Sequence, residues 1–385
     1  MNAANEHLIE QLDQATSWSW LADLTMWTLD QAMTIQQIPA PTFAELARAQ
    51  YVSEQFAAFG LQDIATDDVY NVYGLLPGAN RTRPGLMIAA HTDTVFDAQT
   101  ELTLTREPDV IRGPGIGDNS LGAAALLTAI RALQTLNFTP PRDLWFVATS
   151  REEGLGDLGG MRAAFTRLQP HIDAVINLEG LAFGHVYHAG IAVRRLRISA
   201  QTEGGHSWLH FGRPSAIHGL MTLGAQIATL RPPASPRTTY NIGVIEGGRS
   251  INTIANSACL WLDLRSEDRE TLAALEHEVR DCVEALTTPD LTFEIEVVGD
   301  RPAGRIDPAH PLVQQALAAL AQVGATGALE VGSTDANIPL SAGCPAVTIG
   351  ITRGGNAHRL DEYLETAPVK AGLRQLILLT LATAR

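Results

Sequence analysis

An apolar run that ends in a histidine and an aspartate constrains the fold of this chain more than any other stretch. Residues Leu86–Ala90 are all apolar and are followed by His91 and Asp93. Such a run predicts a buried strand of a parallel sheet, and open α/β sheets bind ligands beyond the carboxyl ends of their strands. Side chains two positions apart on a strand share a face, so Asp93 can lie beside the His91 imidazole and fix its orientation. We therefore expect the chemistry of this protein at the tip of this strand.

Other segments place further carboxylates in a similar way. Two strand-like runs lead into the Glu152-Glu153 pair and into Glu179, and the glycine-rich loop 113–122 carries Asp118 just before a helical segment. Strands that alternate with helices and carry acids at their ends predict an α/β layer with one active edge. Nearer the N-terminus, Thr42-x-x-Glu45 has the spacing of a capping box and predicts a helix start.

The pattern changes at about residue 191. Residues 191–300 read as strand, helix, two strands, helix and strand, the order of a ferredoxin-like βαββαβ unit. We therefore expect an α/β protein of two domains. A catalytic α/β/α domain with a mixed sheet comprises residues 1–190 and 301–385, and the domain of residues 191–300 is inserted between its two parts.

Composition excludes several classes of partner. The chain is 45% hydrophobic and 18% charged, which suits a globular core, and its net charge of −15 offers no general attraction to nucleic acid or to an anionic membrane. No secretory signal and no apolar run of about 18 residues is visible. The three cysteines, Cys259, Cys282 and Cys344, are far apart and form no CxxC pair, so we expect a reduced, cytoplasmic location.

Five candidate metal ligands emerge from these segments and from a loop near the C-terminus: His91, Asp118, Glu153, Glu179 and His358. Carboxylates that converge on one crevice need cations to offset their repulsion. Imidazole nitrogen with carboxylate oxygen suits zinc, and a bridging carboxylate commonly holds two ions about 3.5–4 Å apart. The adjacent acids could divide the work, with Glu153 binding metal and Glu152 meeting the water. A solvated acidic loop is the alternative interpretation.

The order of motifs along the chain resembles one enzyme family. In order, they are AAHTDTVF, GPGIGDNSLG, REEGLGDLGG, NLEG, GGHSWLHFGRPSAIH, EGGRSINTIANSACLWLDLRS, GSTDAN and GNAHRLDEYLE. This series is similar to the M20 metallopeptidases, which include aminoacylase, acetylornithine deacetylase, succinyl-diaminopimelate desuccinylase, carboxypeptidase G and peptidase T. The resemblance covers the chain from about residue 35.

The resemblance implies a role for each matching residue. It makes the five candidates metal ligands with Asp118 bridging, Asp93 the partner of His91, and Glu152 the general base. It gives His206 contact with the tetrahedral intermediate, from a neighbouring subunit across a dimer interface formed by the inserted domain, which is then a lid and dimerisation domain. Arg301 and Arg265 resemble substrate-facing arginines, and the further candidates for substrate binding are Asn252 and Ser333.

The predicted protein is thus a cytoplasmic, homodimeric amide hydrolase with two Zn²⁺ ions, for which Co²⁺ or Mn²⁺ could substitute. A hydroxide formed at the metal ions attacks the amide carbonyl of a small peptide or an N-acyl amino acid, and Glu152 handles the proton. The resemblance implies that a glutamate at position 179 goes with the aminoacylase and deacylase members. A deacylase of the acetylornithine or succinyl-diaminopimelate type and a non-catalytic metal-binding relative stay as alternatives, and the end of the substrate that is recognised is left open.

Overall fold

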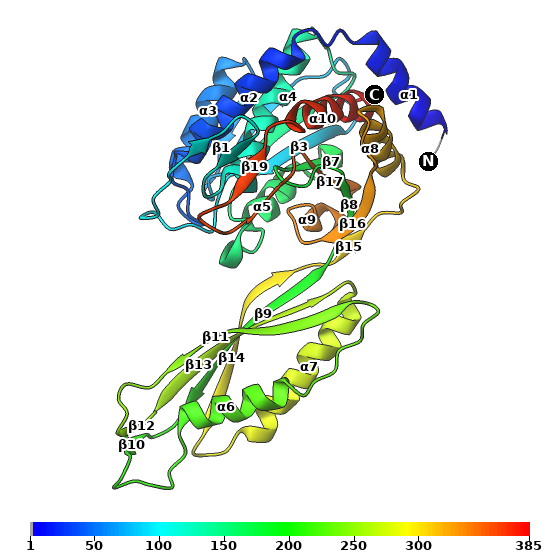
Figure 1. Cartoon of the computed structure of the whole chain (residues 1–385). Helices are drawn as coiled ribbons and strands as arrows, with labels where there is room; N and C mark the ends of the chain where they lie inside the picture. The colour runs from blue at the N-terminus through cyan, green and yellow to red at the C-terminus, as the bar shows by residue number, and fades with distance from the viewer. Residues whose placement is uncertain (1–2) are drawn as a thin grey trace. The chain divides into compact units, whose positions relative to one another are not determined.

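The computed structural model describes residues 3–385, and the chain divides into two compact units (Figure 1). The first unit runs up to Gly190 and resumes with Gly304–Arg385, and the second unit is Ile191–Ala303. Separate clusters of buried apolar residues form the cores of the two units. The second unit is therefore an insertion in the sequence of the first.

A nine-stranded sheet forms the centre of the first unit, as far as residues 3–385 describe it. Its strands are β1 (Gln62–Thr66), β2 (Val72–Leu76), β6 (Leu144–Thr149), β3 (Gly85–His91), β7 (Ile172–Glu179), β17 (Ala346–Gly350), β8 (His185–Gly190) and β15 (Gly304–Arg305) in spatial order, with β16 (Ala328–Gly332) also paired to β8. The neighbours β6, β3, β7 and β17 are parallel, whereas β1, β2 and β15 pair antiparallel with their neighbours. The sheet is therefore mixed, as predicted.

The apolar run at residues 86–90 forms most of the central strand β3, which is buried along its whole length. Leu86 and Ile88 belong to the core on one face of the sheet, and Met87 and Ala89 belong to the core on the other face. A strand buried on both faces reads as a continuous apolar run, which explains its sequence. Since β6, β3 and β7 are parallel, their carboxyl ends meet at one edge of the sheet.

Helices cover both faces of this sheet. One face carries α1 (Ala3–Ala15), α2 (Leu21–Gln36), α3 (Leu46–Ala58), α4 (Gly122–Thr135), α8 (Pro311–Gln322) and α10 (Val369–Thr383), and the other carries α5 (Gly159–Leu168) and α9 (Asn337–Ser341). Two short helical turns lie in loops: η1 (Ile116–Leu121) directly precedes α4, and η2 (Gly154–Gly156) follows β6. The result is the α/β/α arrangement expected for the catalytic unit.

A second, small sheet of the first unit joins two loops that are far apart in sequence. Its order is β18 (Gly354–Gly355), β19 (Tyr363–Glu365), β5 (Val110–Arg112) and β4 (Thr105–Arg106). The antiparallel pairing of β19 with β5 brings the loop that holds His358 beside the glycine-rich loop that holds Asp118.

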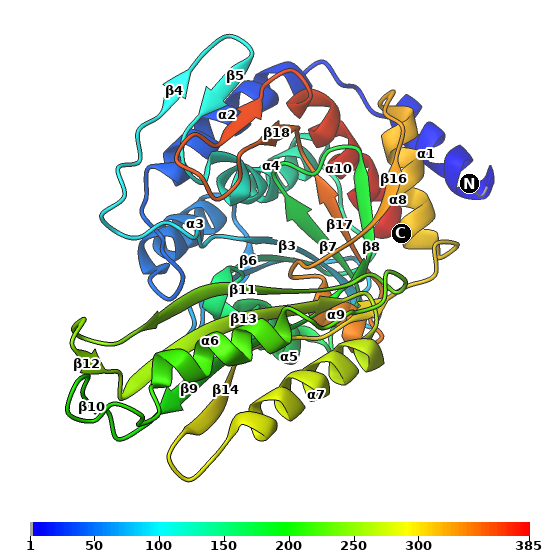
Figure 2. The same cartoon turned by 60° about the horizontal axis from the view of Figure 1, so that its bottom comes forward.

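The inserted unit has the predicted ferredoxin-like order of elements. It contains β9 (Ala192–Gln201), α6 (Ala216–Ile227), β11 (Thr238–Gly247), β13 (Ser257–Ser266), α7 (Arg269–Leu286) and β14 (Thr292–Arg301), with a short ladder of β10 (Gly205–His206) and β12 (Thr253–Ile254). The main sheet has the order β11-β13-β9-β14, with antiparallel neighbours throughout. Figure 2 shows α6 and α7 on one face of this sheet, where their apolar sides form the core of the unit.

The structure confirms the predicted α/β class with a mixed sheet but corrects the capping box. The predicted helix exists as α3, yet Glu45 makes no cap bond. Thr42 and Glu45 instead bond to residues of the sheet edge, as described below, because tertiary partners compete with the helix end for the same polar atoms. No helix of residues 3–385 is both long and apolar enough to cross a membrane.

Candidate metal centre

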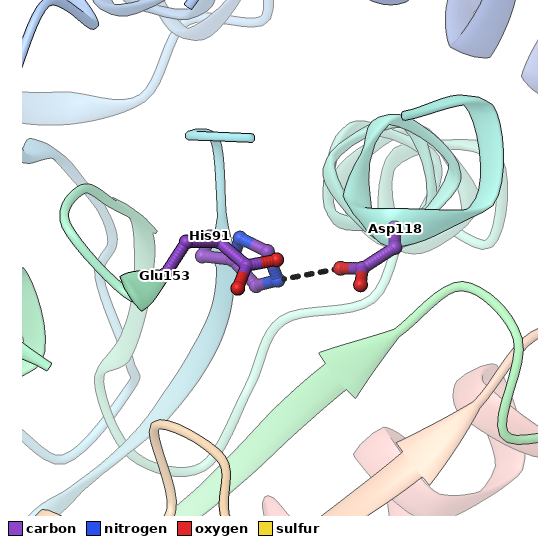
Figure 3. Close-up of side chains that lie close together, drawn as sticks. All are labelled: His91, Asp118 and Glu153. Carbon is purple, nitrogen blue, oxygen red and sulfur yellow. Dashed lines mark ion pairs between the residues drawn. The ribbon is translucent and has the colours of Figure 1, made fainter. Parts of the chain in front are cut away.

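The five candidate ligands come from separate segments and gather at the carboxyl edge of the large sheet. His91 ends β3, Glu179 ends β7, Glu153 follows β6, Asp118 lies in η1, and His358 lies between β18 and β19. Figure 3 shows His91, Asp118 and Glu153 directed at one another, and one ligand atom from each lies within 4.8 Å of the others. Parallel strand ends and two adjoining loops therefore build a single cluster.

Asp118 lies between the two histidines. Its Oδ1 is 3.2 Å from Nε2 of His91, and its Oδ2 is 3.1 Å from Nε2 of His358. On the first side, Oε2 of Glu179 is 3.6 Å from the same nitrogen of His91. On the second side, Oε1 of Glu153 is 3.1 Å from Nε2 of His358. The cluster thus has two halves that share one carboxylate, which is the donor arrangement of a two-ion site.

Asp93 orients the His91 ring, as the i, i+2 spacing predicted. Nδ1 of His91 lies 3.5 Å from Oδ1 of Asp93 and 3.2 Å from its backbone oxygen. With Nδ1 occupied in this way, Nε2 faces Asp118 and Glu179. Burial opposes the charge of the imidazole, but the surrounding carboxylates raise the pKa of His91 well above its ordinary value.

The carboxylate of Asp93 also holds the backbone of the next loop. Its Oδ1 accepts a hydrogen bond from the N–H of Glu152 at 2.9 Å, and its Oδ2 accepts one from the N–H of Glu153 at 3.0 Å. Thr42 donates its hydroxyl to the same Oδ2 at 2.8 Å. Burial opposes the charge of Asp93, but the contact with His91 and the two backbone N–H bonds of Glu152 and Glu153 lower its pKa.

The carboxylates of the cluster repel one another when no cation lies between them. Burial raises the pKa of Glu153 to about 7, and the charges of Asp118 and Glu152 add to that rise. The hydrogen bonds that His358 Nε2 donates to the carboxylates of Asp118 and Glu153 raise the pKa of His358 to about 10. Buried carboxylates that repel one another and hold protonated histidines beside them fit a site built for divalent cations, because such ions would replace those protons.

Three buried acids around the centre are not among the predicted site residues. Glu45 accepts hydrogen bonds from the N–H of Phe43 at 2.9 Å and of Arg151 at 3.0 Å. Asp335 is fully buried, accepts a bond from the Thr149 hydroxyl at 2.6 Å, and has its pKa raised to about 8 by burial and by the charge of Glu152. The third acid is Glu362, which bonds to the glycine-rich loop. The spacing of Glu45 predicts only a helix cap, and the motifs GSTDAN and GNAHRLDEYLE contain Asp335 and Glu362 without indicating a role for either acid.

Of the predicted residues for substrate and intermediate, Ser333 belongs to the first unit, and the others belong to the inserted unit. His206 is an exposed residue of β10 in the inserted unit, where its Nδ1 accepts the N–H of Trp208 at 3.2 Å. Asn252 is exposed in the same unit, and its backbone oxygen accepts the N–H of Ser207 at 3.0 Å. Ser333 is half-buried in the first unit, between β16 and α9.

The two predicted substrate-binding arginines both belong to the inserted unit. Arg301 ends β14 and is 5% exposed. Arg265 lies on β13 and forms an ion pair with Asp263, with 2.6 Å between Nε and Oδ2. Both residues lie on the same strand two positions apart, so their side chains share one face of the sheet.

Comparison with known proteins gives one family and several relatives. The sequence profile of Peptidase family M20/M25/M40 matches residues 87–381. Acetylornithine deacetylase of Klebsiella pneumoniae is 28% identical over 339 residues, which is 83% of this chain and 85% of that protein. The crystal structure of aminopeptidase PepT from Bacillus cereus has a TM-score of 0.76 at 20% identity, over 94% of this chain and 99% of that chain. The Bacillus subtilis YXEP protein, a dinuclear metal binding peptidase, has a TM-score of 0.69 at 14% identity, over 94% and 99%.

Proposed function

This chain belongs to peptidase family M20/M25/M40 and is a hydrolase of amide bonds, and from that premise we propose that it cleaves a small peptide or an N-acyl amino acid at a centre of two zinc ions. The observation that carries this proposal is the position of Asp118, with one carboxylate oxygen toward each histidine. A single carboxylate shared in this way is the usual bridge between two ions.

The ligands divide into two sets around that bridge. His91, Asp118 and Glu179 would hold one ion, and Asp118, Glu153 and His358 would hold the other. Nitrogen with carboxylate oxygen suits zinc, and Co²⁺ or Mn²⁺ could take its place because they accept the same donors. When bound, the ions polarise the scissile carbonyl and lower the pKa of the attacking water from about 15.7 to about 7.

Glu152 is the general base in this proposal. It is buried beside the cluster, since its charge raises the pKa of Glu153, Glu179 and Asp335. Its carboxylate takes the proton from the attacking water and later gives it to the departing amine. Glu153, the next residue, has a different task because its Oε1 faces His358.

The inserted unit supplies most of the remaining residues in this proposal, and the first unit supplies Ser333. The protein is a homodimer through that unit, and His206 donates to the oxyanion of the reaction in the partner subunit's active site, a task for which an imidazole N–H is suited. Arg301 binds a substrate carboxylate bidentately, Arg265 and Asn252 assist it, and Ser333 contacts the same end of the substrate. The three cysteines are free thiols, which agrees with the proposed cytoplasmic location.

A deacylase of the acetylornithine type is the second candidate function. The relative that covers 83% of this chain at 28% identity is an acetylornithine deacetylase, whereas the peptidase structures are at most 20% identical. Glu179 agrees with this candidate, because the family resemblance associates a glutamate at this position with acylase members.

A mass-spectrometric assay distinguishes the two functions. The zinc-loaded protein is incubated with matched free, N-blocked and C-blocked dipeptides and tripeptides and with N-acetyl and N-succinyl amino acids, and Glu152→Gln is the matched control. Cleavage of peptides supports the first function, and cleavage of N-acyl amino acids alone supports the second. A zinc-loaded protein that is inert toward the whole panel would contradict both and support a non-catalytic metal-binding role.

A further inference from the structure

A buried glutamate joins the two loops that carry Asp118 and His358. Glu362 follows His358 by four residues, just before β19, and it is fully buried. Its side chain accepts hydrogen bonds from backbone N–H groups of the glycine-rich loop. Oε1 accepts from Gly117 at 2.7 Å and from Asp118 at 2.8 Å, and Oε2 accepts from Gly115 at 3.1 Å.

The glycine-rich loop is shaped to receive this carboxylate. Gly115 has a φ of +71°, a conformation that favours glycine, and this lets successive N–H groups of the loop turn toward one point. The backbone oxygen of Glu362 also accepts the N–H of Gly113 at 2.9 Å. Four hydrogen bonds therefore connect one residue of the His358 loop to the Asp118 loop.

The two halves of the metal centre differ in how they are supported. His91 and Glu179 end central strands of the large sheet, so the sheet itself fixes their positions. Asp118 and His358 lie in loops, and His358 itself is half exposed, with 53% of its side chain accessible. The separation of these two ligands therefore depends on what joins their loops.

We propose that Glu362 is a positioning residue that sets the distance between Asp118 and His358 and thereby determines the affinity of the second cation site, formed by Asp118, Glu153 and His358. This inference rests on the proposed two-ion centre. Glu362 touches no ion and no substrate. It acts through the backbone of Asp118 and through the loop that it shares with His358. Residues that orient metal ligands in this way typically contribute about 10–100-fold to metal affinity.

The test measures zinc binding and does not depend on activity. Zinc is titrated calorimetrically into metal-free wild type, Glu362→Gln and Glu362→Asp, and the unfolding of each metal-free protein is followed by circular dichroism. Gln keeps the size of the side chain but replaces one accepting oxygen with a donor. Asp keeps the charge, but its side chain is too short to accept hydrogen bonds from both Gly115 and Gly117. Glu365→Gln is the matched control. It removes a carboxylate three residues further along the chain, and Glu365 takes part in none of the four hydrogen bonds between Glu362 and the glycine-rich loop.

The expected result is selective. Glu362→Gln and Glu362→Asp should bind the second zinc about 10–100-fold more weakly and the first zinc within about threefold of wild type, with the control unchanged. Activity of the variants should rise again as the zinc concentration is raised. Two unchanged affinities together with a lower melting temperature would overturn the inference, because Glu362 would then only stabilise the fold. Wild-type protein that binds fewer than two zinc ions would instead contradict the proposed centre, whatever the variants do.

Discussion

The backbone N–H of Glu152 donates a hydrogen bond to Oδ1 of Asp93 over 2.9 Å, so the proposed general base is held by the residue that lies against the proposed metal ligand His91. The other oxygen of Asp93 accepts the N–H of Glu153 at 3.0 Å. One buried carboxylate thus fixes the His91 ring and the backbone of both adjacent acids. Catalytic groups must be held to within a fraction of an ångström, which a shared anchor of this kind provides.

Replacement of this anchor should therefore impair metal binding and turnover together. Asp93→Asn retains one accepting oxygen, but its amide group would face an N–H donor of the 152–153 backbone. We expect zinc affinity to fall about 10–100-fold and kcat to fall as well. Thr42→Val is the matched control, because it removes only one of the donors to Asp93 and keeps the shape of the side chain. Isothermal titration calorimetry would measure zinc affinity, and steady-state kinetics would measure kcat. An Asp93→Asn variant with the same zinc affinity and kcat as Thr42→Val would contradict this expectation.

The two adjacent glutamates should respond differently to substitution. Glu152→Gln should keep its zinc and lose about 10²–10⁴-fold in turnover, because a general base is removed and no ligand is lost. Glu153→Ala should lose zinc as well, because its Oε1 faces His358 in the cluster. Elemental analysis alongside kinetics decides the matter, and equal zinc loss in both variants would rule out the division of roles.

The sequence predicted the central strand, the family and the group of candidate ligands. It did not predict the hydrogen bonds that hold these ligands in place. The apolar run before His91 predicted a buried strand, which the structure confirms, and the alternation of side chains along a strand predicted that Asp93 lies beside His91. The family profile over residues 87–381 confirmed the resemblance. The bond from Glu152 to Asp93 was not predictable, because a spacing of two residues says nothing about a backbone 59 residues further on.

Thr42 and Glu362 illustrate the same limit. Thr42-x-x-Glu45 has the local spacing of a capping box, yet the Thr42 hydroxyl bonds to Asp93, 51 residues away in sequence. Glu362 bonds to loop residues 244 to 247 positions earlier, and no local pattern distinguishes it from neighbouring acids. Support around a site depends on tertiary contacts, which single-sequence patterns do not encode.

His206 should be needed by the partner subunit's active site. Removal of one oxyanion donor costs about 10²–10³-fold in turnover, so His206→Ala should be nearly inactive while it retains zinc. Mixing His206→Ala with Glu152→Gln under conditions of subunit exchange should restore activity, because one site of each heterodimer then has both residues intact.

The matched control for this experiment is His210→Ala mixed with Glu152→Gln. His210 lies in the same loop and its Nδ1 accepts the N–H of His206 at 2.9 Å, so this variant tests loop shape without removal of the proposed donor. His210→Ala alone should stay far more active than His206→Ala. Heterodimers verified by mass spectrometry that remain as inactive as both parents would show that His206 does not act across subunits.

Asp335 should make stability fall as pH rises. Burial and the charge of Glu152 raise its pKa to about 8 in the folded protein, whereas an unfolded aspartate has a pKa of about 3.9. Between these two pKa values the folded state holds one more proton than the unfolded state. The contribution of Asp335 to the free energy of unfolding is therefore complete below about pH 4 and is lost as the pH rises to about 8. Asp335→Asn keeps an oxygen for the Thr149 hydroxyl but cannot ionise. Urea unfolding of metal-free protein from about pH 5 to about pH 8 should show a shallower decline for this variant, and parallel declines would refute the assignment.

The metal content of Asp118→Asn tests the two-ion centre most directly. Asp118 presents one oxygen to each histidine, and an asparagine has only one carbonyl oxygen with which to bind metal. Wild type, dialysed against buffered zinc, should hold two ions per chain by elemental analysis, and Asp118→Asn should hold one at most. Wild type that saturates with a single ion, or an Asp118→Asn variant that retains two, would contradict the central claim that this carboxylate joins two cation sites.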